Sequence, residues 1–234
     1  MDIQEALRAR HSVRQYLDKP LEDDVKAKLQ EIIDECNRDG KLHIQLVCNE
    51  PQAFSSKIAS YGNFKNVTNY IALVGPKSKT LDEKCGYFGQ KIVLEAQMMG
   101  LNTCWVALSY KKIPGAFTVD KGEKLTVVIA IGYGETQGKE RKSKTPEQVC
   151  YDIQSAPLWF KRGVDAALLA PTATNQQKFS INLDGISNRV KIKAGIGPES
   201  KVDLGIVRYN FEVGADKKNF EWAGKDTFEI RITD

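Results

Sequence analysis

The chain has 234 residues, of which 41% are hydrophobic and 27% charged, and it carries a formal net charge of +4 with a pI of about 8.7. These values are typical of a globular protein and exclude the dense basic surface of a nucleic-acid-binding protein. No apolar run is long enough to span a membrane, and the N-terminus lacks the apolar core of a signal peptide. We therefore expect a cytoplasmic protein with no membrane or nucleic-acid partner.

The cysteines and histidines exclude two further classes of protein. The five cysteines form no CxxC pair, and their odd number and wide spacing indicate reduced thiols rather than a disulfide framework. The two histidines, His11 and His43, do not show the spacing of metal ligands, so the sequence predicts no metal site.

The first part of the chain predicts a mixture of helices and short strands. Asp2 and Glu5 form a capping box, so a helix is expected from residue 3, with an apolar stripe on one face. A second amphipathic helix is expected over residues 22–36. The other expected elements are strands over 42–48 and 69–75, a buried helix over 82–99 that ends at Gly100, and strands over 103–107 and 124–131.

A basic loop over residues 139–144 and Pro146 mark a boundary near residue 150. We therefore expect two parts, residues 1–150 and 151–234. Because helices and short strands mix without a regular βαβ period, the pattern favours an α+β fold. The elements expected in the second part are a helix over 158–169, strands over 179–184, 188–194 and 227–232, and a helix near 202–213.

Residues 10–16 read Arg-His-Ser-Val-Arg-Gln-Tyr and directly follow the first expected helix. Arg10, Ser12 and Arg14 place two guanidiniums and a hydroxyl within five residues, a set that suits a phosphate because arginine offers bidentate donors. The alternative is an exposed basic helix end, since cations are favourable near the C-terminus of any helix. His11 is interpreted as a spacer between the donors.

Residues 170–177 read Ala-Pro-Thr-Ala-Thr-Asn-Gln-Gln, a proline-led turn rich in hydroxyls and amides. Such a turn suits a flat polar ring that needs both donors and acceptors, although an ordinary loop at the end of a helix has a similar composition. Together, the two motifs suggest one ligand with a phosphate end and a ring end.

A weak internal repeat connects the two parts of the chain. Residues 41–46 (Lys-Leu-His-Ile-Gln-Leu) resemble residues 178–183 (Lys-Phe-Ser-Ile-Asn-Leu), 137 positions later. In the same register, residues 34–40 align with residues 171–177. Self-similarity at a long period predicts an internal duplication whose first copy has lost the polar turn, although chance also produces similarity over so few residues.

The two motifs together resemble the nitroreductase-like FMN-dependent oxidoreductases. In that family an Arg-x-Ser-x-Arg/Lys run binds the FMN phosphate, and a Pro-Ser-x-x-Asn-x-Gln run, normally much closer in sequence, holds the flavin ring. Here Ala173 stands where the family has a hydroxyl. The resemblance assigns FMN-binding roles to Arg10, His11, Ser12, Arg14, Pro171, Thr172, Ala173 and Asn175.

Two further segments are similar to stretches of that family. Residues 100–108 resemble its Gly-Leu-Gly-Thr-Cys-Trp-Ile-Gly-Gly stretch, whose backbone approaches flavin N5, and this points to Ala107 and Leu108. The alternative is a plain buried strand. Arg141 and Lys142 lie where the family supplies a second phosphate arm, and their alternative role is in a solvated basic loop.

The resemblance implies a nitroreductase-like α+β fold, internally duplicated with a central mixed sheet in each half. It implies a monomer that acts as a pseudo-dimer, with a homodimer as the alternative. It also implies bound FMN, NAD(P)H as a transient reductant, and a nitroaromatic or quinone-like electron acceptor, with the chemistry on the flavin. The sequence lacks a GxGxxG fingerprint, in agreement with a transient nicotinamide. A non-catalytic flavin-binding or interaction protein and another flavin reaction, such as reductive dehalogenation, remain open.

Overall fold

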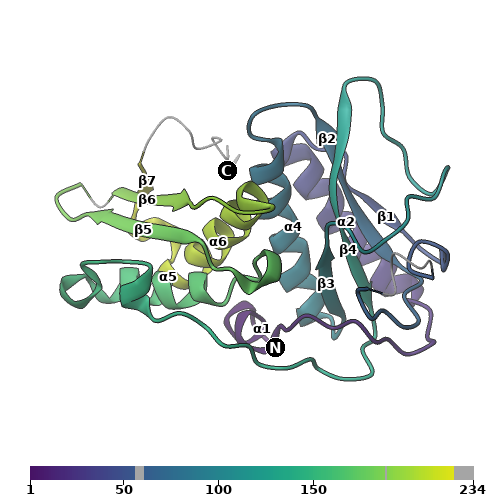
Figure 1. The fold of residues 1–234 in the computed structure, drawn as a ribbon, viewed down its shortest axis with the longest axis horizontal. Coiled ribbons are helices and arrows are strands. Elements are labelled where there is room, and N and C mark those ends of the chain that lie inside the picture. The colour runs from purple at the N-terminus through teal and green to yellow at the C-terminus, as the bar shows by residue number, and fades with distance from the viewer. Residues whose placement is uncertain (56–60, 188, 224–234) are drawn as a thin grey trace. The chain divides into compact units, whose positions relative to one another are not determined.

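The structure, a computed structural model, describes residues 1–55, 61–187 and 189–223 (Figure 1). The described chain divides into two compact units. The first holds residues 1–81 and 91–140, and the second holds residues 82–90 and 141–223. The bounds of these units therefore differ from those of the two expected parts, residues 1–150 and 151–234. The functional roles expected of the two parts stay predictions.

The first unit is built on a four-stranded sheet with the strand order β1-β2-β4-β3. All three strand pairs are antiparallel, so the expected mixed sheet is wrong for this unit. Strand β4 lies between β2 and β3 and runs antiparallel to both, so β2 and β3 run in the same direction, and α4 (Leu81–Met98) carries the chain across from one to the other. The elements are α1 (Ile3–Ala9), α2 (Asp23–Gly40), β1 (Gln45–Val47), β2 (Tyr70–Pro76), the second half of α4 (Leu81–Met98), β3 (Asn102–Val106) and β4 (Glu123–Gly132).

The central strands of this sheet are buried on both faces, as their continuous apolar sequences require. On one face, Tyr70 of β2 joins an apolar cluster with Phe54 and Phe64, whose rings lie 5.0 Å apart. Helices α2 and α4 are tied together by an ion pair between Glu35 and Lys91 at 2.7 Å.

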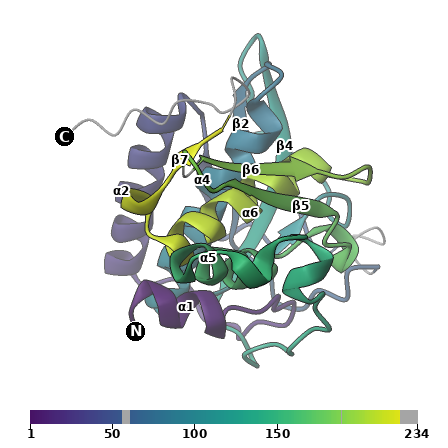
Figure 2. The same ribbon diagram turned by 90° about the vertical axis from the view of Figure 1, so that its left-hand side faces the viewer.

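The second unit is built on a three-stranded sheet with the order β5-β6-β7. Strand β5 pairs with β6 antiparallel and β7 pairs with β6 parallel, so this sheet is mixed. Figure 2 shows α5 and α6 against one face of it. The elements are the first half of α4, η1 (Pro146–Gln148), η2 (Ile153–Ser155), α5 (Leu158–Leu168), η3 (Ala173–Asn175), β5 (Phe179–Asp184), β6 (Arg189–Ala194), α6 (Ser200–Ala215), η4 (Lys217–Asn219) and β7 (Glu221–Trp222).

Two glycines allow the first half of α4 to pack closely on α6. A Cβ at Gly86 would clash with the carbonyl of Val202, and a Cβ at Gly205 would clash with the carbonyl of Glu83. The helices therefore approach at a distance that only glycine permits. Polar side chains pair across the same contact: Glu83 with Arg208, Tyr87 with Glu212, and Gln90 with Asn210.

Most of the predicted elements are confirmed within a few residues of their expected bounds. The capping box of α1 is present, with the Glu5 N–H donating to Asp2 Oδ1 at 2.8 Å. Gly100 has a left-handed φ of 79° directly after α4. The strand expected over 227–232 lies outside the described residues. No disulfide joins the five cysteines, and none of the described helices is long and apolar enough to cross a membrane.

The internal duplication is not confirmed by the structure. A helix followed by a strand occurs in both places, as α2–β1 and as α5–β5. However, α2 continues to Gly40, so residues 34–40 are helical where residues 171–177 form a turn.

Candidate functional site

Residues 10–16 leave α1 as an extended arm that is held by backbone hydrogen bonds. The Val13 N–H donates to the Thr103 carbonyl of β3 at 3.0 Å, and the Tyr16 N–H donates to the Lys65 carbonyl at 3.0 Å. The side chains of Val13 and Tyr16 are buried, and the Tyr16 hydroxyl donates to the Val13 carbonyl at 2.7 Å. The path of the arm is therefore fixed by backbone hydrogen bonds and by the burial of its apolar side chains.

The predicted phosphate donors Arg10, Ser12 and Arg14 alternate along this arm. Arg10 is 4% exposed, whereas Ser12 and Arg14 are exposed. Burial raises the pKa of the Cys104 thiol on β3, and this rise is opposed by the charges of Arg14 and Arg10 and by a hydrogen bond from Ser12. Ser12 lies opposite Thr103 of β3, with Arg10 and Arg14 two residues before and after it along the arm, and this local concentration of donors suits an anion.

The remaining predicted residues of the first unit lie beside the arm or directly after β3. His11 is half-buried and lies against Gly138. Ala107 is half-buried, while Leu108 is 82% exposed, which is unusual for a large apolar side chain. The backbone carbonyl of Leu108 accepts from the Tyr110 N–H at 2.9 Å. The predicted approach of this backbone to a flavin stays a prediction.

The second motif forms a tight turn that includes η3. Pro171 is buried, and the Thr172 hydroxyl accepts from the Gln177 N–H at 3.0 Å. Three residues of the turn adopt left-handed backbone conformations, with φ of 50° at Thr174, 54° at Asn175 and 43° at Gln177. Such conformations are uncommon in residues other than glycine, so other contacts must hold the turn.

Asp203, in the first turn of α6, supplies one of these contacts. Its carboxylate accepts from the Ala173 N–H at 2.9 Å and from Nε2 of Gln176 at 2.7 Å. Burial raises the pKa of Asp203 to about 6, against the influence of both hydrogen bonds. Asp203 does not stand out in the sequence, because an acidic residue in the first turn of a helix is ordinary. The partners of Asp203 lie about 30 positions away.

Gln177 supports the turn from the inside and is only 2% exposed. Its Oε1 accepts from the Lys144 N–H at 2.8 Å, and its Nε2 donates to the Leu168 carbonyl at 2.9 Å and to the Ser143 hydroxyl at 3.0 Å. Lys144 returns the contact, with Nζ donating to the Gln177 carbonyl at 2.7 Å. A buried amide with this many partners has a supporting role.

The structure places Arg141 and Lys142 beside the same turn. Nη2 of Arg141 donates to the carbonyls of Leu168 and Ala170 at 3.0 and 2.8 Å, at the end of α5, and burial lowers its pKa. The Lys142 side chain is exposed, and its backbone carbonyl accepts from Nδ2 of Asn175 at 2.8 Å. Arg141 therefore satisfies the last carbonyls of a helix, and its predicted phosphate role stays a prediction.

The predicted residues thus form two groups, one in each unit. The first unit gathers cationic and hydroxyl donors on the arm, which can bind an anion. The second unit presents an amide and backbone groups on a rigid turn, which can hydrogen bond to a polar ring. The second group is Arg141, Lys142, Pro171, Thr172, Ala173 and Asn175.

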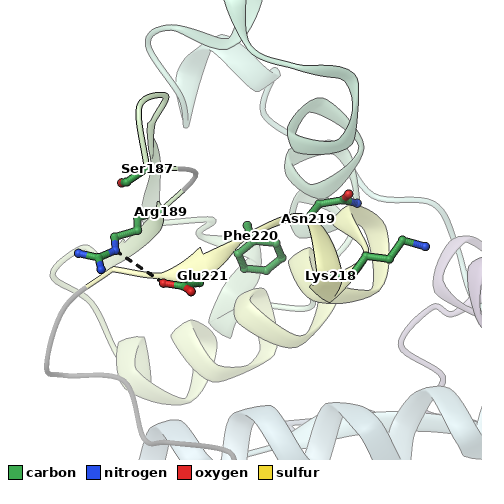
Figure 3. Close-up of a pocket in the computed structure, with 6 residues that line it drawn as sticks. All are labelled: Ser187, Arg189, Lys218, Asn219, Phe220 and Glu221. Atoms are coloured by element: carbon green, nitrogen blue, oxygen red, sulfur yellow. Dashed lines mark ion pairs between the residues drawn. The ribbon is translucent and has the colours of Figure 1, made fainter.

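A separate pocket of about 290 Å³ in the second unit contains none of the predicted site residues. Figure 3 shows Arg189 turned toward Glu221 and Lys218 pointing away from Arg189. Nε of Arg189 is 3.8 Å from Oε2 of Glu221. Lys218 is paired with Asp216 at 2.7 Å. Because both cations already have carboxylate partners, this pocket offers little to an anionic ligand.

Comparisons with known proteins agree with the family resemblance. A family model described as "Putative TM nitroreductase" matches residues 2–215. A structure from Thermotoga maritima described as a "putative nitroreductase" is 25% identical, covers 94% of this chain and 87% of its own, and has a TM-score of 0.67. Comparison with curated proteins gave no match.

More distant structures share the fold or part of it. A nitroreductase family protein from Streptococcus pneumoniae is 11% identical over 63% of this chain and 98% of its own, with a TM-score of 0.51. A structure from Desulfovibrio desulfuricans in complex with FMN is 15% identical over 63% of this chain and 95% of its own. Its TM-score of 0.47 does not carry its ligand over to this chain.

Proposed function

The chain belongs to the nitroreductase family whose model spans residues 2–215, and from this membership we propose that it is an FMN-dependent oxidoreductase. The observation that carries the proposal is the arm of residues 10–16. Backbone hydrogen bonds hold this arm in an extended course beside β3, and it carries two guanidiniums and a hydroxyl within five residues. This set of donors suits a phosphate and lies within the residues that the family model matches, and the two observations together support the proposal.

The arm would hold the phosphate of FMN. Arg14 and Ser12 are exposed and available to a ligand, and Arg10 adds a charge from a buried position. Charge-assisted hydrogen bonds from guanidiniums to a phosphate are among the stronger contacts in proteins. The arm keeps its course without these side chains, so they can face a ligand without a structural penalty.

The turn of residues 171–177 would hold the flavin ring. Asn175 is exposed at the tip, and the left-handed backbone at Thr174 and Asn175 fixes its direction. Asp203 and Gln177 hold this conformation from inside the unit. Rigid donors and acceptors suit a planar heterocycle, because little conformational entropy is lost on binding.

The bound flavin would supply the redox chemistry, accepting hydride at N5 and passing electrons on, while the chain binds, orients and shields it. NAD(P)H is the proposed transient reductant. The proposed acceptor is an electron-poor small molecule such as a nitroaromatic or a quinone.

We propose one FMN per chain. The segment that aligns with the ring-binding turn, residues 34–40, is the last part of helix α2, so a second turn of this kind is missing from it. A monomer acting as a pseudo-dimer is the proposed assembly. The alternative is a homodimer in which each flavin takes its arm from one chain and its turn from the other.

A visible spectrum tests the oxidoreductase proposal. The purified chain is reconstituted with FMN, freed of excess flavin and mixed anaerobically with NADH or NADPH. Bleaching of the flavin band, followed by recovery on addition of a quinone, is the expected result. A protein that retains FMN but is not bleached by either nucleotide is a flavin-binding protein without this activity. A chain that retains no FMN contradicts the proposal itself.

A further inference from the structure

A cluster of three potential metal ligands lies in the first unit, outside both motifs. It consists of His43, just before β1, Asp120 in the turn before β4, and Glu123, the first residue of β4. One ligand atom from each residue lies within 4.8 Å of the other two. Nδ1 of His43 is 2.8 Å from Oε2 of Glu123 and 4.0 Å from Oδ2 of Asp120.

Contacts that do not involve these ligand atoms hold the two segments together. The Gln45 side chain of β1 donates to the Thr118 carbonyl at 2.8 Å and accepts from the Thr118 N–H at 2.8 Å. The His43 N–H donates to the Val74 carbonyl of β2 at 2.9 Å. The cluster is therefore positioned by the fold and does not rely on its own ion pair.

The carboxylate of Glu123 is oriented in advance. Its Oε2 accepts from the Asp120 N–H at 2.9 Å, and the Glu123 N–H donates back to the Asp120 carbonyl at 2.9 Å. These two bonds fix the Glu123 side chain against the Asp120 backbone, so its carboxylate faces His43 before any ion binds.

The far side of the imidazole also has a polar neighbour. Nε2 of His43 lies 3.5 Å from the Thr118 hydroxyl. When one ring nitrogen of a histidine binds a metal, the other N–H usually donates to an oxygen, which fixes the tautomer and the ring orientation. A simple ion pair of His43 needs one carboxylate, whereas this cluster offers two.

We propose that His43, Asp120 and Glu123 bind one Zn²⁺ ion through Nδ1 and two carboxylate oxygens, with water completing the coordination. Imidazole nitrogen favours zinc over Mg²⁺ or Ca²⁺, which take oxygen ligands. Ligand atoms about 2.0–2.2 Å from a tetrahedral zinc lie roughly 3.3–3.5 Å apart, within the range of the distances found here. Asp120, whose side chain is 73% exposed, has the freedom to close on the ion.

The ion would join the segment before β1 to the start of β4, so its effect would be on stability. A ligand that binds only the folded state raises the melting temperature in proportion to the logarithm of its concentration above the Kd. The sequence alone did not suggest this site, because His43 is separated by 80 positions from Glu123.

The test titrates the tag-free chain with ZnCl₂ and follows binding by calorimetry and by the imidazole proton NMR signals. The chain has only two histidines, so substitution assigns both signals. One zinc per chain, a shift of the His43 signals and unchanged His11 signals are expected. His43→Gln and Asp120→Asn should each weaken binding at least tenfold, and at a given zinc concentration the melting temperature should rise less in either variant than in the unsubstituted chain.

Two control variants are matched to these substitutions. His11→Gln and Glu31→Gln, an exposed glutamate of α2, should leave zinc affinity unchanged. Asp120→Asn removes an exposed side chain, so it keeps the test valid if His43→Gln folds poorly. The proposal is overturned if the His43 signals do not respond to millimolar zinc, or if His43→Gln and Asp120→Asn bind zinc as tightly as the unsubstituted chain.

Discussion

The two predicted binding regions are held in opposite ways. The arm of residues 10–16 is held by its backbone, through bonds such as that from Val13 to Thr103. The turn of residues 171–177 is held by side chains, chiefly those of Asp203 and Gln177. The exposed polar side chains of the arm, those of Ser12 and Arg14, can therefore change without changing its shape, whereas the turn loses its shape when its polar side chains are lost.

This difference predicts that substitutions in the arm and in the turn have different effects on ligand binding and on the free energy of unfolding. Substitutions of exposed polar residues in the arm should weaken ligand binding and leave unfolding nearly unchanged. Substitutions of the supporting residues of the turn should affect both, because left-handed residues such as Thr174 and Asn175 persist only where the surroundings enforce them.

The largest effect is expected for Gln177→Leu. This change leaves the Lys144 N–H without its acceptor and removes the donor to the Leu168 carbonyl. Because these groups are buried, we expect a loss of about 2–4 kcal/mol in the free energy of unfolding, measured by urea denaturation. The matched control is Gln15→Leu in the arm, where the backbone carbonyl makes the hydrogen bond to Glu135. Equal losses in the two variants would contradict the comparison.

The next largest effect is expected for Arg14→Ala. Loss of one charge-assisted hydrogen bond should weaken FMN affinity by about 1.5–3 kcal/mol, or roughly tenfold to a hundredfold. Riboflavin, which lacks the phosphate, should bind the variant and the unsubstituted chain alike, and unfolding should change by less than about 0.5 kcal/mol. Fluorescence titration with both flavins measures this. If riboflavin loses as much affinity as FMN, Arg14 does not hold the phosphate.

A smaller, pH-dependent effect is expected at Asp203. Its folded pKa of about 6 exceeds its ordinary value of 3.8, so the protonated form favours folding. This stabilisation is complete below about pH 4 and is lost as the pH rises through about 6. From pH 7.5 to pH 5, the unsubstituted chain should gain about 1–1.5 kcal/mol more stability than Asp203→Asn. Urea denaturation measures the free energy of unfolding of both proteins at the two pH values. If it changes by the same amount in both, Asp203 does not titrate in this way.

The smallest effect is expected when two damaged chains are mixed. If each flavin takes its arm and its turn from one chain, a mixture of Arg14→Ala and Asn175→Ala chains contains only damaged sites, and activity with FMN should not recover. Subunit exchange must be allowed by incubation, and each variant alone serves as the control. Partial recovery would support a homodimer with shared sites and contradict the pseudo-dimer.

Secondary structure was largely predictable because it depends on local patterns. The capping box of Asp2 and Glu5 and the left-handed Gly100 act within a few residues, and both are confirmed. Strand direction in the first unit was predicted wrongly, because alternation and apolar content do not encode whether a neighbouring strand runs parallel or antiparallel. The extension of α2 through residues 37–40, beyond its expected end at residue 36, was also missed.

The candidate site was predictable only where its residues are contiguous. The arm and the turn are short motifs, so a resemblance could identify them. Asp203, Gln177 and Lys144 act through contacts about 30 positions apart, and Asp203 and Lys144 are ordinary in their local sequence. The partners of Arg141 illustrate the same point, because a basic loop gives no sign that its one guanidinium donates to carbonyls at the end of α5.

The central claim is that one FMN binds per chain, with its phosphate recognised by the arm. Titration of the flavin-free protein with FMN and with riboflavin, followed by flavin absorbance after denaturation, tests it most directly. We predict one FMN per chain and an affinity at least tenfold higher for FMN than for riboflavin. Two FMN per chain, equal affinities for the two flavins, or no binding at saturating FMN would contradict the account.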